Sequence, residues 1–241
     1  MKKHLFLLLC LYTSLHTYGQ KAYKLQSPDG NIQVSISLSD KIYYDVTYQQ
    51  DTLLKQCNLQ MELSNQELGN APKLAGVNKK SVDESLKPVI PLKYSTVANK
   101  YNQLLMKFKG DYSVEFRAFN DGIAYRFITN KKGMIEVNNE TFQVNFPENY
   151  LLHVQHPGGF KTAYEEEYKH IESKDWKSSD KMALLPILID THKDYKILIS
   201  ESDLADYPAL FLKSNGNNGM FSVFPKVPLE FGDDGDRSLK I

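Results

Sequence analysis

Regular alternation of apolar and polar residues constrains the fold of this chain more than any other feature of its 241 residues. Residues 32–38 read Ile-Gln-Val-Ser-Ile-Ser-Leu, so that every second side chain is apolar. A period of two is typical of a β-strand that turns one face to the core and the other to water. The same alternation recurs at residues 42–48, 59–63, 104–108, 114–118, 123–127 and 142–146. The pattern therefore predicts many short strands.

The segments between these strands carry further signals. Asn120, Asp121 and Gly122 join two alternating segments, which is one of the stronger signals for a β-hairpin. Residues 65–91 lose the pattern and are rich in Gly, Pro, Asn, Lys and Ser, which predicts a long irregular connection. Longer apolar runs predict strands that are covered on both faces. These runs are residues 182–189, 195–199, 209–212 and 220–224.

Helical signals are scarce in this sequence. Only residues 162–171 favour a helix, because Tyr164, Tyr168 and Ile171 would share one helical face at i, i+4 and i+7. Many short strands without alternating helices predict an all-β sandwich with one or two short helices. We find no internal repeat and no break in composition, so we expect a single large domain.

Composition and charge exclude some classes of protein. Hydrophobic residues make up 41% of the chain, which is enough to fill a core and argues against disorder. Lys and Arg number 29, as do Asp and Glu, so the formal net charge is zero. A protein that binds a nucleic acid duplex needs a concentrated positive surface. We therefore expect no nucleic acid partner.

The first 19 residues have the pattern of an export signal. Lys2 and Lys3 precede a short apolar run at residues 5–12, and small residues lead to a plausible cleavage site after Gly19. The run is shorter than the roughly 20 residues that span a bilayer, so we expect no membrane span. Lipidation at Cys10 is disfavoured because Leu9 is a poor residue before it. The mature domain, residues 20–241, is expected in the periplasm or outside the cell.

Three segments of the mature chain resemble a known family. Residues 25–30 (Leu-Gln-Ser-Pro-Asp-Gly), the strand-turn-strand of residues 114–127 and residues 201–207 follow in the order seen in the N-terminal domain of glycoside hydrolase family 97. That family contains exported α-glucosidases and α-galactosidases of glycan-degrading bacteria. The resemblance covers nearly the whole mature chain, and residues 114–127 are its most specific part.

The resemblance implies a fold and a role. The family's N-terminal domain is a large super-β-sandwich, similar to the sugar-binding fold of the galactose mutarotases, and a catalytic (β/α)₈ barrel follows it. This chain stops before a barrel could begin, so we expect a truncated form. Glycoside cleavage needs two carboxyl groups about 5 to 10 Å apart around one bond. The family's pair lies in the barrel, so the resemblance implies no catalytic residue in this chain and no activity of the chain alone.

A calcium ligand is implied by the same resemblance. In the family the sandwich lends one glutamate to a calcium ion at the barrel's active site, from a stretch similar to residues 162–168. Spacing back from Tyr168 indicates Glu165, and one extra residue after Thr162 leaves Glu166 and Glu167 as alternatives. Calcium takes six to eight oxygen ligands, so one loop could hold it only together with the barrel. For the isolated chain, a solvated acidic turn is the favoured interpretation.

Other candidate site residues each have a structural alternative. Glu201 and Asp206 could face the sugar or the barrel, while Asp206 and Tyr207 could instead make local hydrogen bonds in a turn before Pro208. Trp176, the only tryptophan, could stack on a sugar ring or anchor an amphipathic surface segment.

Charged and imidazole side chains allow further hypotheses. Arg117 and Arg126 could bind a sugar hydroxyl, but cross-strand pairing with Glu115 is favoured. His153 and His156 lie three residues apart, which would suit a metal only on a helix, and the local pattern there is strand and loop.

Two classes of function remain after the sequence is read. The first is a non-catalytic sandwich module that packs on the catalytic barrel of a glycoside hydrolase acting on α-glucoside or α-galactoside oligosaccharides. The second is a stand-alone protein, either a mutarotase-like enzyme using His153, His156 and Glu201 as acid and base, or a glycan-binding protein. The sequence contains no phosphate-binding loop, no Gly-x-Ser-x-Gly and no His-Glu-x-x-His that would suggest other chemistry.

Overall fold

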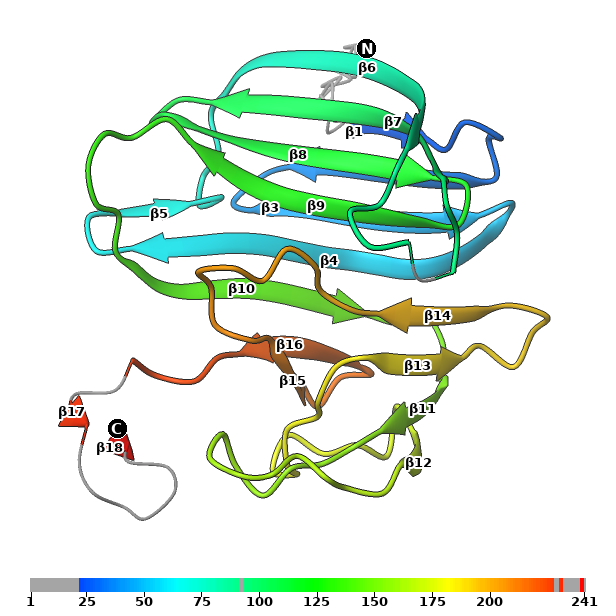
Figure 1. Ribbon diagram of the computed structural model, residues 1–241, viewed down its shortest axis with the longest axis vertical. Coiled ribbons are helices and arrows are strands. Elements are labelled where there is room, and N and C mark those ends of the chain that lie inside the picture. Colours follow the sequence, from blue (N-terminus) through cyan, green and yellow to red (C-terminus); the bar gives the residue numbers. More distant parts are fainter. Residues whose placement is uncertain (1–21, 92, 228–229, 232–238, 241) are drawn as a thin grey trace, which may run out of the picture.

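The computed structural model describes residues 22–91, 93–227, 230–231 and 239–240. The described chain contains strands and connections but no helix, and the predicted all-β class is confirmed (Figure 1). No described segment is therefore a helix that could cross a membrane. The predicted export signal lies outside the described residues.

The largest sheet has eight strands and contains most of the first third of the chain. Its order is β1-β2-β3-β4-β10-β16-β15, and β5 pairs with β4. The strands are β1 (Ala22–Gln26), β2 (Ile32–Leu38), β3 (Ile42–Tyr48), β4 (Asp51–Leu63), β5 (Gln66–Leu68), β10 (Val137–Asn145), β15 (Phe211–Ser214) and β16 (Gly219–Val223). Every neighbouring pair is antiparallel.

Two four-stranded sheets and one short pair complete the fold. The first has the order β6-β7-β8-β9, with β6 (Leu74–Leu86), β7 (Val97–Phe108), β8 (Tyr112–Phe119) and β9 (Gly122–Thr129). The second has the order β12-β11-β13-β14, with β11 (Leu151–Val154), β12 (Lys169–Glu172), β13 (Ile187–Asp190) and β14 (Lys196–Ile199). The short pair is β17 (Glu230–Phe231) and β18 (Leu239–Lys240).

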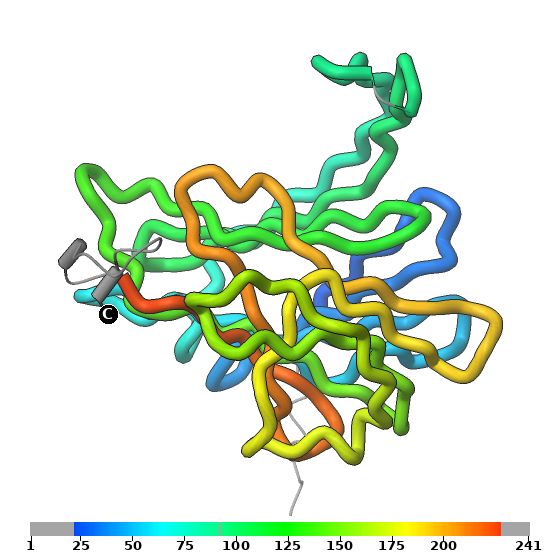
Figure 2. The backbone as a smooth tube through the Cα atoms, turned by 60° about the horizontal axis from the view of Figure 1, so that its bottom comes forward, coloured from blue at the N-terminus to red at the C-terminus, as the bar shows by residue number. Residues whose placement is uncertain are grey.

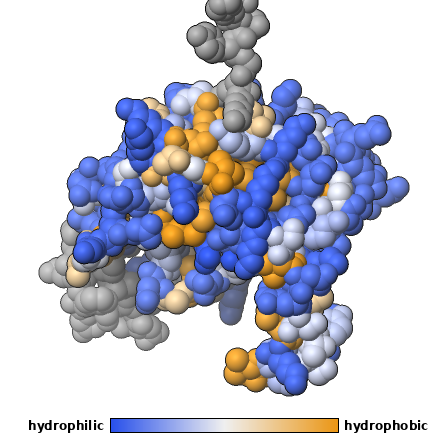
Figure 3. All heavy atoms as spheres, turned by 90° about the horizontal axis from the view of Figure 1, so that it is seen from above, coloured by the Kyte–Doolittle hydropathy of each residue, from blue (hydrophilic) through white to orange (hydrophobic). Residues whose placement is uncertain are grey.

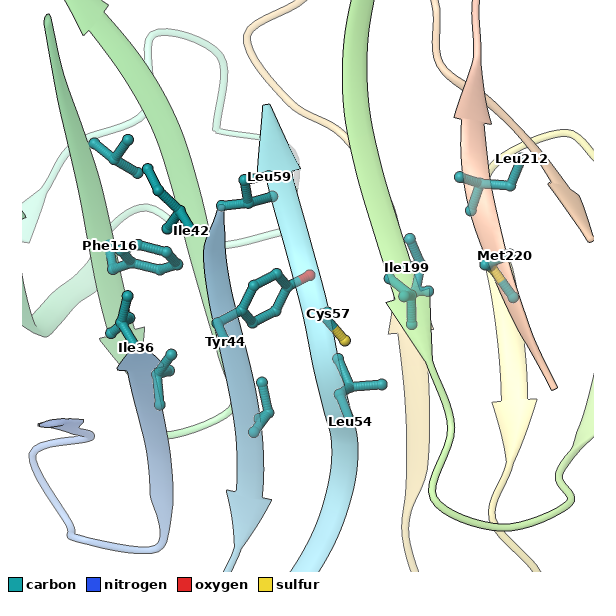
Figure 4. Packing of buried hydrophobic residues seen from close by; sticks show 14 of the residues in the cluster. Ile36, Ile42, Tyr44, Leu54, Cys57, Leu59, Phe116, Ile199, Leu212 and Met220 are labelled. Atoms are coloured by element: carbon teal, nitrogen blue, oxygen red, sulfur yellow. The ribbon is translucent and has the colours of Figure 1, made fainter. Parts of the chain in front are cut away.

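The core lies between the large sheet and the β6–β9 sheet. Strands β1 and β2 contact β8, and β1 also contacts β7. Figure 4 shows Phe116 of β8 reaching toward Ile36 and Tyr44 of the facing sheet, and the Phe116 and Tyr44 ring centroids are 6.1 Å apart. The same cluster also contains Leu212 of β15 and Met220 of β16. The alternating residues predicted to face inward are the ones that fill this core.

The Asn120-Asp121 hairpin is confirmed. Phe119 pairs with Gly122, so only these two residues connect β8 to β9. The structure also places Asn120 against the first turn of the chain, because its side-chain oxygen accepts a 3.0 Å hydrogen bond from the backbone N–H of Asp29.

The predicted irregular connection at residues 65–91 is wrong. Most of it forms β5 and β6, and β6 pairs along its length with β7. The outer half of this hairpin projects from the body (Figure 2) and is exposed on both faces, so no alternation marks it. Figure 3 shows apolar residues at the end of the projecting lobe, where Val89, Ile90 and Tyr94 are exposed.

The predicted helix at residues 162–171 is also wrong. Residues 162–168 have no regular structure, and Lys169–Glu172 form β12 against β11. Tyr164 has a φ of 61°, which a right-handed helix excludes. Of the three residues with helical spacing, Tyr164 and Tyr168 therefore lie in the loop, and Ile171 lies in strand β12.

The prediction that the later strands are covered on both faces is only partly confirmed. In β15 both Phe211 and Leu212 are buried. In β13 and β14, however, Leu188 is 39% and Leu198 is 62% exposed, because the outer face of their sheet has no covering layer in the described chain.

Candidate functional site

Two loops that the sequence analysis considered separately both reach Phe211, the first residue of β15. The loop of residues 159–168 is the later part of the connection from β11 to β12, and the loop of residues 200–210 connects β14 to β15. The rings of Phe160 and Tyr164 pack on Phe211, with centroid distances of 5.0 and 5.7 Å. The residue before Phe211 is Leu210, whose backbone N–H bonds to Glu201. We call this surface, residues 159–168 and 200–210, the two-loop face.

The three glutamates of the acidic cluster are exposed on the two-loop face. None of the carboxylates of Glu165, Glu166 and Glu167 makes a hydrogen bond or an ion pair within the described chain. The loop backbone is held instead by Gln155, whose side-chain amide donates to the carbonyl of Glu166, and by the Tyr164 hydroxyl, which donates to the carbonyl of Phe160. Within the described chain, only the backbone of this acidic stretch is held by hydrogen bonds.

The donors of this cluster suit calcium in kind but not in number. Calcium prefers carboxylate and carbonyl oxygens and takes six to eight of them. Within the described residues, no three side chains of His, Cys, Asp or Glu converge on one metal position. A calcium ion at Glu165, or at its alternatives Glu166 and Glu167, would need most of its ligands from elsewhere.

Glu201 braces the second loop. Both of its carboxylate oxygens lie 3.1 Å from the backbone nitrogen of Leu210, so the N–H is shared between them. Burial raises the pKa of Glu201, and the negative charge of Glu140 adds to the rise, while the Leu210 N–H opposes it. The carboxylate therefore has a structural partner and is half-buried rather than open to a ligand.

Tyr207 holds the same loop to the body of the sandwich. Its hydroxyl donates a 2.7 Å hydrogen bond to Oε2 of Glu140 on β10, and the hydroxyl of Tyr125 on β9 donates to Oε1 at 2.9 Å. Burial raises the pKa of both phenols, and so does the charge of Glu140, so both remain donors. Tyr207 thus makes a long-range bond rather than the local turn bond considered from the sequence. Asp206 is exposed beside it.

Sequence reasoning missed Glu140 altogether. It lies in the polar run Val-Asn-Asn-Glu-Thr at residues 137–141, and no motif marks it. Glu140 accepts hydrogen bonds from Tyr125 and Tyr207, and it lies near them because β10 pairs with β4 and β16 in the large sheet.

Trp176 lies in a different place from the surface position expected of it. Its side chain is only 1% exposed, and its ring centroid is 5.7 Å from that of His156. Trp176 therefore belongs to the core and cannot stack on a sugar from this position. Its indole N–H has no hydrogen-bond partner in the described chain. The polar residues next to it in sequence suggested exposure, but its ring packs against His156, which is 20 residues away in the chain.

The two histidines considered as a pair are used separately. His156 is buried, and its Nδ1 lies 2.9 Å from the carbonyl oxygen of Met182, which accepts the hydrogen bond. His153 lies on β11 and faces His170 of β12. The pairing of neighbouring strands, not the spacing in sequence, decides which imidazoles meet.

Arg117 and Arg126 pair with a buried carboxylate, as the favoured prediction stated. Nε of Arg117 lies 2.7 Å and Nε of Arg126 lies 3.3 Å from Oε1 of Glu115. Arg117 also lies over the ring of Tyr101, at 4.7 Å from its centroid. Together these contacts stabilise the β7–β8–β9 surface.

Comparison with known proteins agrees with this architecture. Residues 25–230 match the family described as Glycosyl-hydrolase 97 N-terminal. The chain is 34% identical to a retaining alpha-galactosidase of Bacteroides thetaiotaomicron over 251 aligned residues, which cover 100% of this chain and 38% of that protein. The chain thus spans well under half the length of this curated relative.

Two solved structures show the same fold. A variant of a Glycoside Hydrolase Family 97 enzyme from Pseudoalteromonas sp. superposes with a TM-score of 0.73 at 22% identity, over 84% of this chain and 32% of that one. A beta-arabinopyranosidase superposes with a TM-score of 0.77 at 22% identity, over 88% of this chain and 37% of that one. With its sandwich fold and with the match over most of its length, this chain belongs to the glycoside hydrolase family 97 N-terminal domain family.

Proposed function

We propose that this chain serves as the N-terminal, non-catalytic module of an exported glycoside hydrolase that acts on α-galactosides. The relative at 34% identity is a retaining alpha-galactosidase, which favours this sugar over the α-glucosides that the family also suggests. In this proposal the pair of carboxyl groups that cleaves the substrate belongs to a separate catalytic barrel, and the sandwich supports that barrel.

The two-loop face is the surface that we assign to the barrel. Large side chains that are ordinarily buried are exposed there, namely Tyr164, Tyr168, Leu204 and Tyr207. Exposed aromatic residues are enriched where protein surfaces meet. This group of exposed aromatic and apolar residues, beside three carboxylates that have no partner in the described chain, is the observation that carries the proposal.

Glu165 is proposed as the ligand that the module lends to a calcium ion at the barrel, with Glu166 and Glu167 as the alternatives. The support is its exposure and its lack of partners among the described residues, together with the hydrogen bonds of Gln155 and Tyr164 that hold its own loop. A ligand on a braced surface loses little freedom when it binds, which favours affinity.

Export remains part of the proposal on the strength of the sequence alone. Lys2, Lys3 and the apolar run of residues 5–12 support secretion or a periplasmic location after cleavage near Gly19.

The test is an exchange of modules. The N-terminal region of the Bacteroides retaining alpha-galactosidase is replaced by this chain, and both the chimera and the chain alone are assayed with p-nitrophenyl α-galactoside. We expect turnover by the chimera and none by the chain alone. Tyr168→Asp, which adds charge to the two-loop face, should lower the chimera's activity, while Tyr94→Asp on the projecting hairpin should not. Turnover by the chain alone would contradict a supporting role.

Glycan binding by the module itself is the second candidate, and one surface feature favours it. A hollow of about 590 Å³ on the large sheet is lined mostly by amides, and amides both donate to and accept from sugar hydroxyls. The amides are those of Gln56, Gln143, Asn145, Asn215 and Asn217. Retention of the chain on an immobilised α-galactoside column, reduced by Gln143→Leu, would support this function, and passage without delay would remove it.

The mutarotase-like alternative has less support. His153 faces His170, His156 bonds to the carbonyl of Met182, and Glu201 bonds to the N–H of Leu210. Each of the three residues that were to act as acid and base is therefore engaged by a different partner.

A further inference from the structure

His153 and His170 face each other across two neighbouring strands. They are direct partners in the antiparallel register of β11 and β12. Their Nδ1 atoms are 2.6 Å apart, and the ring centroids are 4.7 Å apart with the planes at 75°. His170 is exposed and His153 is half-buried, so the pair is open to solutes.

The contact between two Nδ1 atoms limits the protonation states of the pair. A neutral imidazole has one N–H and one lone pair, so one ring must donate from Nδ1 and the other must accept. If both rings carry their proton on Nε2, two lone pairs point at each other, and only a cation between them makes that arrangement favourable. A metal ion is such a cation, and it binds neutral imidazole through a ring nitrogen.

Among the described residues, the neighbouring side chains leave the pair without a third protein ligand. Glu172, two residues along β12, is bonded to Asn149 and lies 3.6 Å from His192. Gln155, two residues along β11, donates to the carbonyl of Glu166. On the other side of His153 the cross-strand neighbour is the apolar Leu188. Two imidazoles and water would therefore make up the ligand set.

This donor set selects the class of metal. Calcium and magnesium prefer oxygen ligands, whereas imidazole suits zinc, copper and nickel. With Zn–N bonds of about 2.05 Å and a tetrahedral angle, two ligating nitrogens lie about 3.3 Å apart. The two Nδ1 atoms would have to separate by about 0.7 Å from their present distance, which small side-chain rotations at an exposed site allow.

We propose that His153 and His170 form a binding site for a divalent transition-metal ion of the zinc or nickel class. The bound ion would link β11 to β12 at the point where the acidic loop of residues 159–168 enters β12. The site does not depend on the calcium proposal, since it uses nitrogen donors on strands rather than carboxylates on the loop.

The experiment is a titration of the tag-free chain with ZnCl₂ and separately with NiCl₂, followed by isothermal calorimetry. We expect saturable binding of one ion per chain, and affinity at least tenfold weaker in both His153→Ala and His170→Ala. His192→Ala, which removes an exposed imidazole elsewhere, should bind like the unchanged chain, and CaCl₂ should not compete. His4 and His16 are present in every variant, so differences between variants report on the strand pair.

Thermal unfolding of the same proteins provides the second measurement. Without metal, the two single variants should unfold near the temperature of the unchanged chain, which shows that they are folded. At saturating zinc the unchanged chain should unfold at a higher temperature, and the two variants should lose this shift. Three results would each overturn the proposal: no saturable binding, binding by His153→Ala or His170→Ala as tight as by the unchanged chain, or an equal loss of affinity in His192→Ala.

Discussion

The hydroxyl of Tyr207 donates a hydrogen bond of 2.7 Å to the carboxylate of Glu140, which lies 67 residues earlier in the chain. Through this bond a loop that carries part of the family resemblance is attached to the central strands of the large sheet. Glu201 joins the two ends of the same loop by accepting the N–H of Leu210. These two bonds brace the loop of residues 200–210, which forms one half of the two-loop face.

Tyr207→Phe should weaken that attachment. The change removes one donor from a half-buried carboxylate, and a hydrogen bond to a charged group contributes about 1.5 to 3 kcal/mol. Because Tyr207 is partly exposed, we expect the free energy of unfolding to fall by about 1 kcal/mol, measured by urea denaturation. Tyr94→Phe on the projecting hairpin is the matched control and should leave the stability unchanged. Equal stability of the two variants would show that the bond to Glu140 contributes nothing.

Glu201 should make stability depend on pH. Its pKa in the folded chain is raised above the ordinary value of 4.5, mainly by burial, so the folded state holds this proton more tightly than the unfolded state. The corresponding stabilisation is present below pH 4.5 and is lost as the pH rises through the folded pKa. The free energy of unfolding of the unchanged chain, measured by urea denaturation, should therefore fall between pH 4 and pH 7. The fall should be smaller in Glu201→Gln. Parallel curves for the two proteins would refute this.

Phe116 should be among the most sensitive positions of the core. It is 1% exposed and lies between Tyr44 and Tyr125, with centroid distances of 6.1 and 6.2 Å. Phe116→Ala would leave a cavity between the two sheets and should cost about 3 to 5 kcal/mol of unfolding free energy. Phe116→Leu should cost less, because it keeps most of the volume. A cost below about 1 kcal/mol for the alanine variant would mean that the sheets do not pack through this ring.

Fluorescence can test the burial of Trp176 directly, because it is the only tryptophan of the chain. An indole that is 1% exposed should emit at short wavelength and resist quenching by iodide and acrylamide. Addition of galactose or melibiose should leave the spectrum unchanged, since the ring cannot reach a sugar. Strong quenching by iodide in the folded chain would place the ring at the surface instead.

The alternation of apolar and polar residues predicted those strands that bury one face in the core. Residues 32–38 and 114–118 alternate because Val34, Ile36 and Phe116 face the core, and Asn120 and Asp121 mark a hairpin whose register they determine. The pattern failed for β6, since a strand that projects into solvent on both faces has no reason to alternate.

Candidate-site residues were harder to predict, because their partners are distant in sequence. His153 meets His170 and Tyr207 meets Glu140 only through strand pairing and loop packing. The polar neighbours of Trp176 gave no sign of its burial, which depends on contact with His156. What the sequence did locate is the acidic cluster, because three adjacent glutamates between two tyrosines need no tertiary context to be noticed.

Calcium titration of the module-exchange chimera tests the central claim most directly. Activity is measured against calcium concentration for the chimera and for its Glu165→Gln, Glu166→Gln and Glu167→Gln forms, with Glu62→Gln as an exposed control. We predict that Glu165→Gln raises the calcium concentration for half-maximal activity at least tenfold and that Glu62→Gln leaves it unchanged. A shift confined to Glu166→Gln or Glu167→Gln would move the ligand to that residue. Identical titrations for all of these proteins would contradict the account, because the sandwich would then lend nothing to the catalytic site.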